Sequence, residues 1–393
     1  MKKIFNNLFY FFLFPLFIHA VQVTINNLRP RLDINGVIMD THDGSIQQFK
    51  KNSLYYMHAM QYGLCEEPPK YGCDGAGMSS KCGFQMNHNI TIWSSPNLTS
   101  GSWSYVGNAI TVADRPAGVV FRPHLVYNPN TKLYVLIWNY MRWNLPSLYA
   151  VTIAETPSGP FRLVNPSLNV SRGGGGKVYI IVFIHLINLF NFLGDFDILV
   201  NDDGTGYIVY SQNYYMSVEQ LTPDFYYSTG KSYMFEEYFV EAPIFMKKNN
   251  IYYILFGWCC CYCMQGSGVL VHRANNPLGP YTLQAGGDLA CVTKSDYSLT
   301  KVHLTSINGL PTPNQGCEYH NINTTSIVRS QQNYIIKVTN STGYTTYLWT
   351  GDRWQQAPDG IKGHEPQFWT PLNFYENGTI GKIQWLDEFI LNV

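Results

Sequence analysis

The sequence predicts an all-β fold, a five-bladed β-propeller whose four-stranded blades surround a central funnel. Two observations lead to it: a charged residue recurs twelve positions before a tyrosine, and each such pair encloses a turn between two strand-like runs. The pairs are Asp43 with Tyr55, Arg122 with Tyr134, Asp195 with Tyr207, and Glu241 with Tyr253. The innermost strands of propeller blades run side by side around one axis, so residues at the same end of those strands should meet at one mouth.

Each of these units has the pattern of a β-hairpin. The charged residue opens an apolar run, a turn of Asn, Asp, Lys, Pro or Gly follows, and a tyrosine-rich run returns. The turns lie at 50–52, 128–130, 201–204 and 247–250. The intervals between units are longer than one hairpin and near the length of a four-stranded blade.

Further strand pairs fill those intervals. Apolar runs at 90–93, 149–153 and 269–272 are each followed by a glycine and an aromatic residue, and they predict the outer strands of blades one, two and four. A looser fifth unit consists of runs at 331–336 and 344–349 around a turn at 340–343. The predicted number of blades is therefore five.

The composition suits a β core and a neutral partner. Aromatic residues make up 15% of the chain, and it contains 33 glycines and 21 prolines. Charged residues make up only 13%, and the formal net charge is zero, so there is no electrostatic case for nucleic acid. The expected partner is a neutral molecule.

The N-terminus predicts secretion. Lys2 and Lys3 precede an apolar stretch at 8–18, and small residues near Ala20 offer a cleavage site, which is typical of a signal peptide over residues 1–20. The mature chain, 21–393, is then expected to be one extracellular, monomeric domain without a membrane span. Six sequons for N-glycosylation lie in polar, turn-like segments: Asn89, Asn97, Asn169, Asn323, Asn340 and Asn377.

In an oxidising compartment the nine cysteines favour disulfides over metal ligands. The crowded cysteines at 259–263 leave a zinc cluster as the alternative, although no second spaced Cys/His pair accompanies them. The pairing of the cysteines does not follow from their spacing. No cofactor is predicted, and nothing in the sequence supports a structural calcium ion.

The apolar run at 178–193 does not fit a propeller. It is short for a membrane span and falls where a surface connection between blades two and three is expected. Gly-Lys-Val at its start and Phe-Leu-Gly at its end are what translated splice boundaries would give, so a retained intron is one hypothesis. A genuine membrane-surface or oligomerisation insert is the other.

Three of the converging residues are carboxylates, Asp43, Asp195 and Glu241, and the fourth is Arg122. Acid–base cleavage of an acetal needs a carboxylic acid to protonate the leaving oxygen and a carboxylate to activate water on the opposite face. A third group holds the proton and the orientation of the acid. A single acidic residue at a strand start is usually a turn cap or a solvated edge, but three in one register favour a catalytic set.

Several motifs add a resemblance. They are Arg-Pro-His at 122–124, Gly-Asp-Phe-Asp at 194–197, Glu-Ala-Pro at 241–243 followed by Tyr-Tyr at 252–253, and Gly-Asp-Arg-Trp at 351–354. The chain resembles the five-bladed propellers of glycoside hydrolase family 43 over nearly its whole mature length. That resemblance implies hydrolysis of arabinan, xylan or galactan with inversion of configuration. It also implies that Asp43 is the base, Glu241 the acid and Asp195 the residue that tunes the acid.

The branch it resembles most contains exo-acting β-1,3-galactanases, with two departures. Where that branch has a glycine, this chain has Asp43, and where it has a glutamate before Arg-Pro, this chain has Phe121. Members of the branch are thought to use a last-blade glutamine in place of the base carboxylate, and Gln331 matches its position. Asp43 is the predicted base, because a carboxylate accepts a proton from water far more readily than an amide does. Gln331 and Asp40 are the alternatives.

Four residues are expected to bind the sugar: His42, Arg122, Trp138 and Gln331. His42 and Arg122 would donate hydrogen bonds to hydroxyl groups, and Trp138 would stack on a ring unless it packs between blades instead. The competing function is a secreted carbohydrate-binding propeller that keeps the pocket without turnover.

Overall fold

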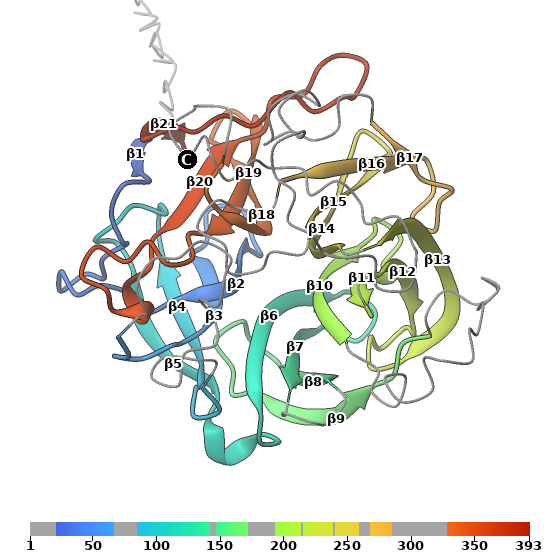
Figure 1. The fold of residues 1–393 in the computed structure, drawn as a ribbon, viewed down its shortest axis with the longest axis horizontal. Helices are drawn as coiled ribbons and strands as arrows, with labels where there is room; N and C mark the ends of the chain where they lie inside the picture. Colours follow the sequence, from blue (N-terminus) through green and yellow to red (C-terminus); the bar gives the residue numbers. More distant parts are fainter. Residues whose placement is uncertain are drawn as a thin grey trace, which may run out of the picture.

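Five of the six sheets in the described chain surround one axis (Figure 1), and the sixth has two strands. The computed structural model describes residues 21–66, 85–141, 147–171, 193–213, 215–238, 240–258, 268–284 and 328–393. Four sheets have four antiparallel strands, and the fifth has three strands within these residues. The predicted five-bladed propeller is therefore confirmed.

The blades follow one another along the chain. Blade one contains β2 (His42–Gln48), β3 (Tyr55–Met60), β4 (Ile90–Ser95) and β5 (Ser104–Ile110). Blade two contains β6 (Val119–Asn128), β7 (Leu133–Met141), β8 (Leu148–Ala154) and β9 (Arg162–Leu168). Blade three contains β10 (Leu193–Val200), β11 (Gly206–Gln212), β12 (Tyr215–Leu221) and β13 (Ser228–Tyr238). Blade four contains β14 (Val240–Lys248), β15 (Ile251–Trp258), β16 (Leu270–Ala274) and β17 (Thr282–Leu283). Blade five contains β18 (Gln331–Thr339), β19 (Thr345–Asp352) and β20 (Gln367–Pro371).

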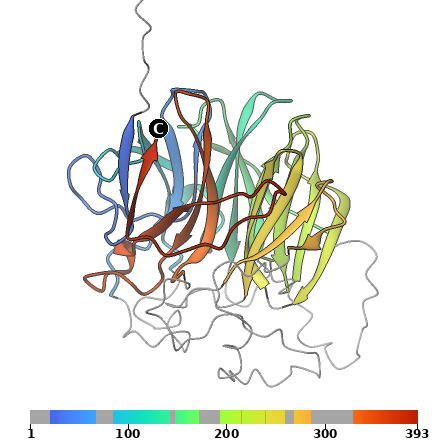
Figure 2. The ribbon, with the colours of Figure 1, turned by 90° about the horizontal axis from the view of Figure 1, so that it is seen from above.

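The first strand of every blade lies nearest the axis. The strands β2, β6, β10, β14 and β18 contact one another in that order, and β18 contacts β2 again, so they form a closed ring. Seen from the side, the strands run broadly along the axis (Figure 2). The starts of the five inner strands therefore lie at one end of the ring.

The hydrophobic core is divided into layers between adjacent blades. Each of the five large clusters of buried apolar side chains draws its residues from two neighbouring blades. The layer between blades one and two, for example, joins Ile90 and Ile92 of β4 to Trp138 of β7. Aromatic and branched side chains fill the wedge between twisted sheets, which accounts for the high aromatic content.

The two ends of the described chain close the ring together. Strand β1 (Gln22–Asn26) pairs antiparallel with β21 (Glu388–Asn392) beside blade five. Asn27, directly after β1, is fully buried and bonds to β20: its Nδ2 donates to the Trp369 carbonyl at 2.8 Å, and its Oδ1 accepts from the Trp369 N–H at 2.9 Å. The same Nδ2 donates to the Leu386 carbonyl at 2.9 Å. Asn27 thus continues the three-stranded fifth blade.

Replacement of Asn27 by alanine is expected to lower the free energy of unfolding by about 2–4 kcal/mol, because it leaves buried backbone groups of β20 unpaired. Urea denaturation followed by tryptophan fluorescence would measure the change. Asn26→Ala is the matched control, since the Asn26 side chain accepts only an exposed local bond from the Leu28 N–H. Equal stability of the two variants would contradict this account of ring closure.

Some predictions fall outside the described residues. These are the signal peptide, Asn323 and every cysteine except Cys65, so secretion and disulfide pairing stay predictions. Of the apolar run at 178–193 only Leu193 is described. Leu193 begins β10 and is buried, and its carbonyl accepts hydrogen bonds from Ser147 Oγ at 2.6 Å and Asn139 Nδ2 at 3.2 Å. Within the described part of the chain, no helix has the length and apolar character needed to cross a membrane.

Candidate active site

Every inner strand begins with a break in its pairing register. The breaks fall between His42 and Ser45, Phe121 and His124, Leu193 and Phe196, Glu241 and Ile244, and Gln332 and Tyr334. In three of them a residue with a side chain adopts a positive φ, namely Asp43 at 51°, Arg122 at 49° and Ala242 at 56°. This conformation is unfavourable for such residues, and a bulge changes the direction in which a side chain points. The same local distortion therefore marks the place where the candidate residues gather.

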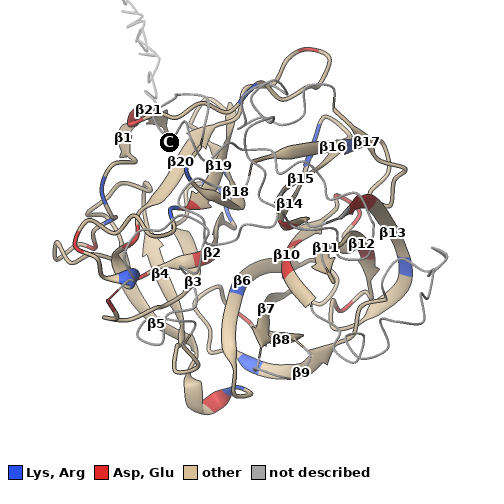
Figure 3. Ribbon diagram, in the orientation of Figure 1, with Lys and Arg blue, Asp and Glu red and all other residues tan. Residues whose placement is uncertain are grey.

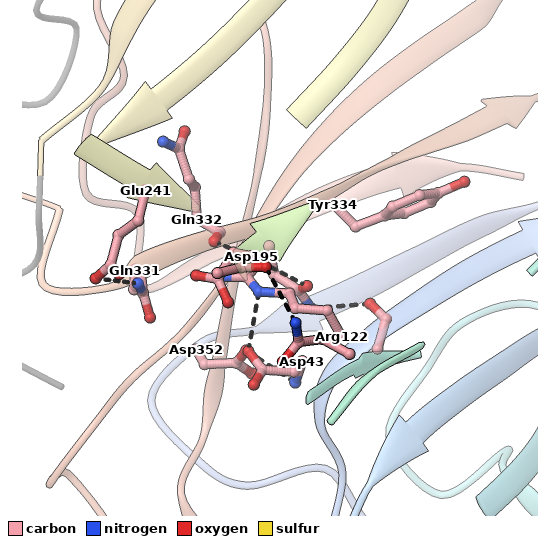
Figure 4. Close-up of polar contacts among 12 residues, drawn as sticks. Asp43, Arg122, Asp195, Glu241, Gln331, Gln332, Tyr334 and Asp352 are labelled. Carbon is pink, nitrogen blue, oxygen red and sulfur yellow. Dashed lines mark hydrogen bonds and ion pairs between the residues drawn. The ribbon is translucent and has the colours of Figure 1, made fainter. Parts of the chain in front are cut away.

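Arg122 links the blades at this end of the ring (Figure 4). Figure 3 shows a basic position on β6 and acidic positions on β2 and β10. Its Nη2 lies 3.1 Å from Asp195 Oδ2 on β10, and its Nε lies 3.4 Å from Asp43 Oδ1 on β2. Its Nη1 donates to the Gln332 carbonyl at 2.9 Å and to Asn333 Oδ1 at 3.0 Å, both on β18. Only 1% of the Arg122 side chain is exposed. Arg122 therefore holds two carboxylates in place, and the expected direct contact with sugar hydroxyls has little exposed surface to support it.

Asp43 lies deep in the site. Its side chain is 4% exposed, and its Oδ1 accepts no hydrogen bond within the described residues. Its backbone N–H donates to Asp352 Oδ2 at 3.0 Å. Burial raises the pKa of Asp43 to about 8; Arg122 opposes the rise, whereas Asp352 and Asp195 add to it. A buried carboxyl of this kind is a stronger proton acceptor than an exposed one once it is ionised.

Glu241 lies on the other side of Asp195 from Asp43 (Figure 4). It is half-buried at the start of β14 and accepts a hydrogen bond at 3.4 Å from Gln331 Nε2 on β18. Gln331 Oε1 in turn accepts the indole N–H of Trp354 at 2.8 Å. An indole N–H is only a donor, so it fixes which end of the Gln331 amide is oxygen and leaves the NH₂ group facing Glu241. The structure thus gathers Asp43, Asp195, Glu241 and Gln331 around one end of the ring.

His42, next to Asp43 in the chain, is buried against an acidic residue and two aromatic rings. It is 1% exposed, and its Nε2 lies 2.9 Å from Glu365 Oε2. Burial alone would lower the pKa of His42, but Asp40 and Glu365 outweigh that effect and raise it to about 10. The side chain packs between Tyr62 and Trp354, with ring centroids 4.7 Å and 5.8 Å away. The imidazole is buried and paired with Glu365, so it has little exposed surface for the predicted contact with a sugar hydroxyl.

The structure places Trp138, the predicted stacking residue, between the blades. It is 0% exposed and lies in the hydrophobic layer between blades one and two. Strand alternation sends its side chain between the sheets, which is the packing alternative named above. Asp40, the third candidate base, accepts the backbone N–H groups of Tyr62 and Gly63 at 2.9 Å and 2.6 Å, so its carboxylate stabilises a turn.

The sequence-based prediction missed three residues of the site: Asp352, Trp354 and Glu365. Asp352 and Trp354 belong to the Gly-Asp-Arg-Trp sequence at 351–354, which was noted for its resemblance alone. Glu365 is fully buried and accepts from His42 and from the Gln355 N–H, and Lys362 Nζ lies 3.5 Å away. No spacing pattern connects these residues to β2 or β14, because only the folded ring brings them together. Within the described residues, no cluster of three His, Cys, Asp or Glu side chains is arranged to hold a metal ion.

Comparisons with known proteins agree with this architecture. No family model and no curated protein sequence matches the chain. Among solved structures it is similar to an exo-β-1,3-galactanase from Clostridium thermocellum, with a TM-score of 0.64 and 19% identity over 93% of this chain and 66% of that one. A GH43 β-1,3-galactosidase solved with galactodeoxynojirimycin gives a TM-score of 0.66 and 18% identity, covering 92% of this chain and 99% of the other.

An exo-β-1,3-galactanase from Phanerochaete chrysosporium, solved with β-1,3-galactotriose, gives a TM-score of 0.62 at 17% identity over 93% of this chain and 67% of that chain. This chain therefore spans about two thirds of the length of the two galactanases. The fold expected from the resemblance to family 43 is thereby confirmed.

Proposed function

We propose that this chain is a secreted glycoside hydrolase that cleaves O-glycosidic bonds of a neutral polysaccharide of the galactan, arabinan or xylan type by single-displacement inversion. One observation carries the proposal. At the starts of the inner strands, Asp43 and Asp195 lie on either side of one buried arginine, Arg122, and Glu241 begins the next inner strand with Gln331 donating to it. A buried cluster of carboxylates is costly unless it is paired, and such clusters are typical of acid–base sites.

The geometry supports separate roles for the carboxylates. Glu241 is more exposed than Asp43 and acts as the acid that protonates the leaving oxygen. Asp43 acts as the base that takes a proton from water, because its raised pKa makes it an effective acceptor. Asp195, held by Arg122 between them, tunes the acid. The fixed amide of Gln331 argues against that residue as the base, since its NH₂ group already donates to Glu241.

The substrate class favoured is a β-1,3-linked galactan. The similar structures named above include exo-β-1,3-galactanases, one of which was solved with β-1,3-galactotriose. Phe121, which stands where that branch has a glutamate, packs against the buried cluster of Met60, Tyr62 and Trp354. It offers an apolar surface beside Arg122, which suits the C–H face of a pyranose ring.

The test is turnover by the secreted protein. A eukaryotic host should release into the medium a species whose mass falls on deglycosylation. That species is expected to hydrolyse an aryl β-galactoside and to release galactose from β-1,3-galactan, with the α-anomer appearing first in the proton NMR spectrum. Initial release of the β-anomer would contradict inversion. Binding of the polysaccharide without any product would favour the carbohydrate-binding alternative.

A further inference from the structure

The segment 351–354 interacts with two carboxyls of the candidate site, with Asp43 directly and with Glu241 through Gln331. At the end of β19, Asp352 Oδ2 accepts the backbone N–H of Asp43 at 3.0 Å. Two residues later, Trp354 Nε1 donates to Gln331 Oε1 at 2.8 Å, and Gln331 Nε2 donates to Glu241 at 3.4 Å. One short stretch of chain therefore contacts the base directly and the acid through one amide. Figure 4 shows the contact of Asp352 with Asp43 and that of Gln331 with Glu241.

The segment itself is held rigidly. A Cβ atom at Gly351 would overlap Ser330 Oγ and the Gln331 carbonyl, so only glycine allows this approach to β18. Arg353 is anchored by Gln356 Oε1, at 3.0 Å and 2.8 Å, and by the Asn27 carbonyl. The Lys362 ammonium lies 4.5 Å from the centroid of the Trp354 ring. These contacts give the segment the stiffness that a positioning element needs.

We propose that 351–354 positions both catalytic carboxyls, with Asp352 acting on Asp43 and Trp354 acting through Gln331 on Glu241. This proposal rests on the proposed function, which assigns Asp43 as the base and Glu241 as the acid. Neither Asp352 nor Trp354 is assigned a contact with substrate, so both are positioning residues.

Asp352 acts on Asp43 through its negative charge. Asp352 is 1% exposed, and the charged groups facing it are Asp43 and His42 from β2, Arg122 from β6, Glu365 after the 3₁₀ turn Lys362–His364, and Arg31 before β2. Burial raises the pKa of Asp352, while His42 and Arg122 oppose the rise. Because Asp352 places a negative charge beside Asp43, removing that charge should lower the pKa of Asp43.

Trp354 acts on Glu241 through its indole N–H, which holds the Gln331 amide. Without the Trp354 N–H, the Gln331 oxygen loses its donor. When Glu241 is protonated, as an acid must be before it acts, the amide can then turn and accept the Glu241 O–H instead of donating to Glu241, so the acid loses its fixed orientation. Phenylalanine keeps most of the ring packing and removes only this donor, which separates the hydrogen bond from the bulk of the side chain.

Asp352→Asn is expected to shift the ionisation of Asp43, because asparagine keeps an acceptor for the Asp43 N–H and loses the charge. Infrared spectroscopy gives the first readout, through the carbonyl stretch of the protonated acid, assigned by its loss in Asp43→Asn. Its midpoint, expected near pH 8 in the parent protein, should fall by about one unit or more, and a limb of the kcat/KM profile should move with it. Asp359→Asn, in an exposed turn nearby, is the control. An unchanged midpoint in Asp352→Asn would overturn the proposed effect of Asp352 on Asp43.

Trp354→Phe is expected to lower kcat about 10-fold on galactan and much less on an activated aryl galactoside, because only a poor leaving group needs an oriented acid. Trp349→Phe is the matched control, since Trp349 lies on β19, the strand that ends two residues before Trp354, and its buried indole N–H has no hydrogen-bond partner within the described residues. If the ratio of kcat on galactan to kcat on the aryl galactoside is the same in Trp354→Phe and Trp349→Phe, the proposed role of Trp354 is overturned.

These tests separate the inference from the proposed function. If the parent protein shows no turnover, the function fails, yet the infrared midpoint still reports on Asp352. The indole N–H resonance of Trp354, assigned by its loss in Trp354→Phe, should move when Gln331 is replaced by methionine and stay in place in Asp359→Asn. A resonance that does not respond to Gln331→Met overturns the relay whether or not the protein is an enzyme.

Discussion

Asp43→Asn is expected to reduce kcat by about 10²–10⁴ or more and to change ligand affinity little. The amide keeps the size and polarity of the carboxylate but cannot take a proton from water. Arg122 Nε, 3.4 Å from Asp43 Oδ1, still finds an oxygen in the variant, so the surrounding geometry should persist. Steady-state kinetics on β-1,3-galactan and calorimetric binding of a galactose-derived iminosugar would measure the two effects separately.

The competing base is Gln331. If Gln331→Ala abolishes turnover while Asp43→Asn spares it, the amide mechanism of the galactanase branch holds and the assignment of Asp43 is wrong. Asp203→Asn is a suitable control, since Asp203 is an exposed turn residue at the opposite end of β10. It makes the same chemical change without touching the site.

Glu241→Gln is expected to cost about 10²–10⁴ in kcat on galactan and far less on aryl galactosides with good leaving groups. An activated phenolate departs without a proton, so the missing acid matters only for the natural linkage. The Gln331 NH₂ group can donate to the new amide oxygen, which limits any structural change. Parallel kinetics on both substrate types, in parent and variant, give the ratio that identifies an acid.

Equal losses on the two substrate types would show that Glu241 positions the substrate or acts as the base. In that case the acid would have to be sought among the remaining carboxyls, with Asp195 the first candidate because its side chain, 16% exposed, is more accessible than that of Asp43. Asp195→Asn is the variant that decides between them.

The inner strands could be predicted because their signal is local. A charge, a turn and a tyrosine run recur within a few residues of each other, and β2, β6, β10 and β14 all begin within a few residues of the predicted charge. The partnership of β1 with β21 could not be predicted in this way, since strand pairing between distant segments leaves no spacing to recognise.

The site shows the same division. Strand register placed Asp43, Asp195 and Glu241 at one mouth, because residues at equivalent positions of equivalent strands must meet. Trp138 was assigned to the mouth although its strand sends it between the sheets. Asp352 lies at the end of a second strand, outside the repeating pattern, and it reaches Asp43 only because blade five closes against blade one.

Ring closure also has a consequence for the order of events during synthesis. Arg122 and Asp195 belong to blades two and three, but Gln331, Asp352 and Trp354 belong to blade five, and the clasp of β1 with β21 uses a strand that leaves the ribosome after all of them. A growing chain can therefore build its early blades while the acid and the base still lack their fifth-blade partners. Under the proposed function, the site is complete only after the inner strand of blade five packs between those of blades four and one.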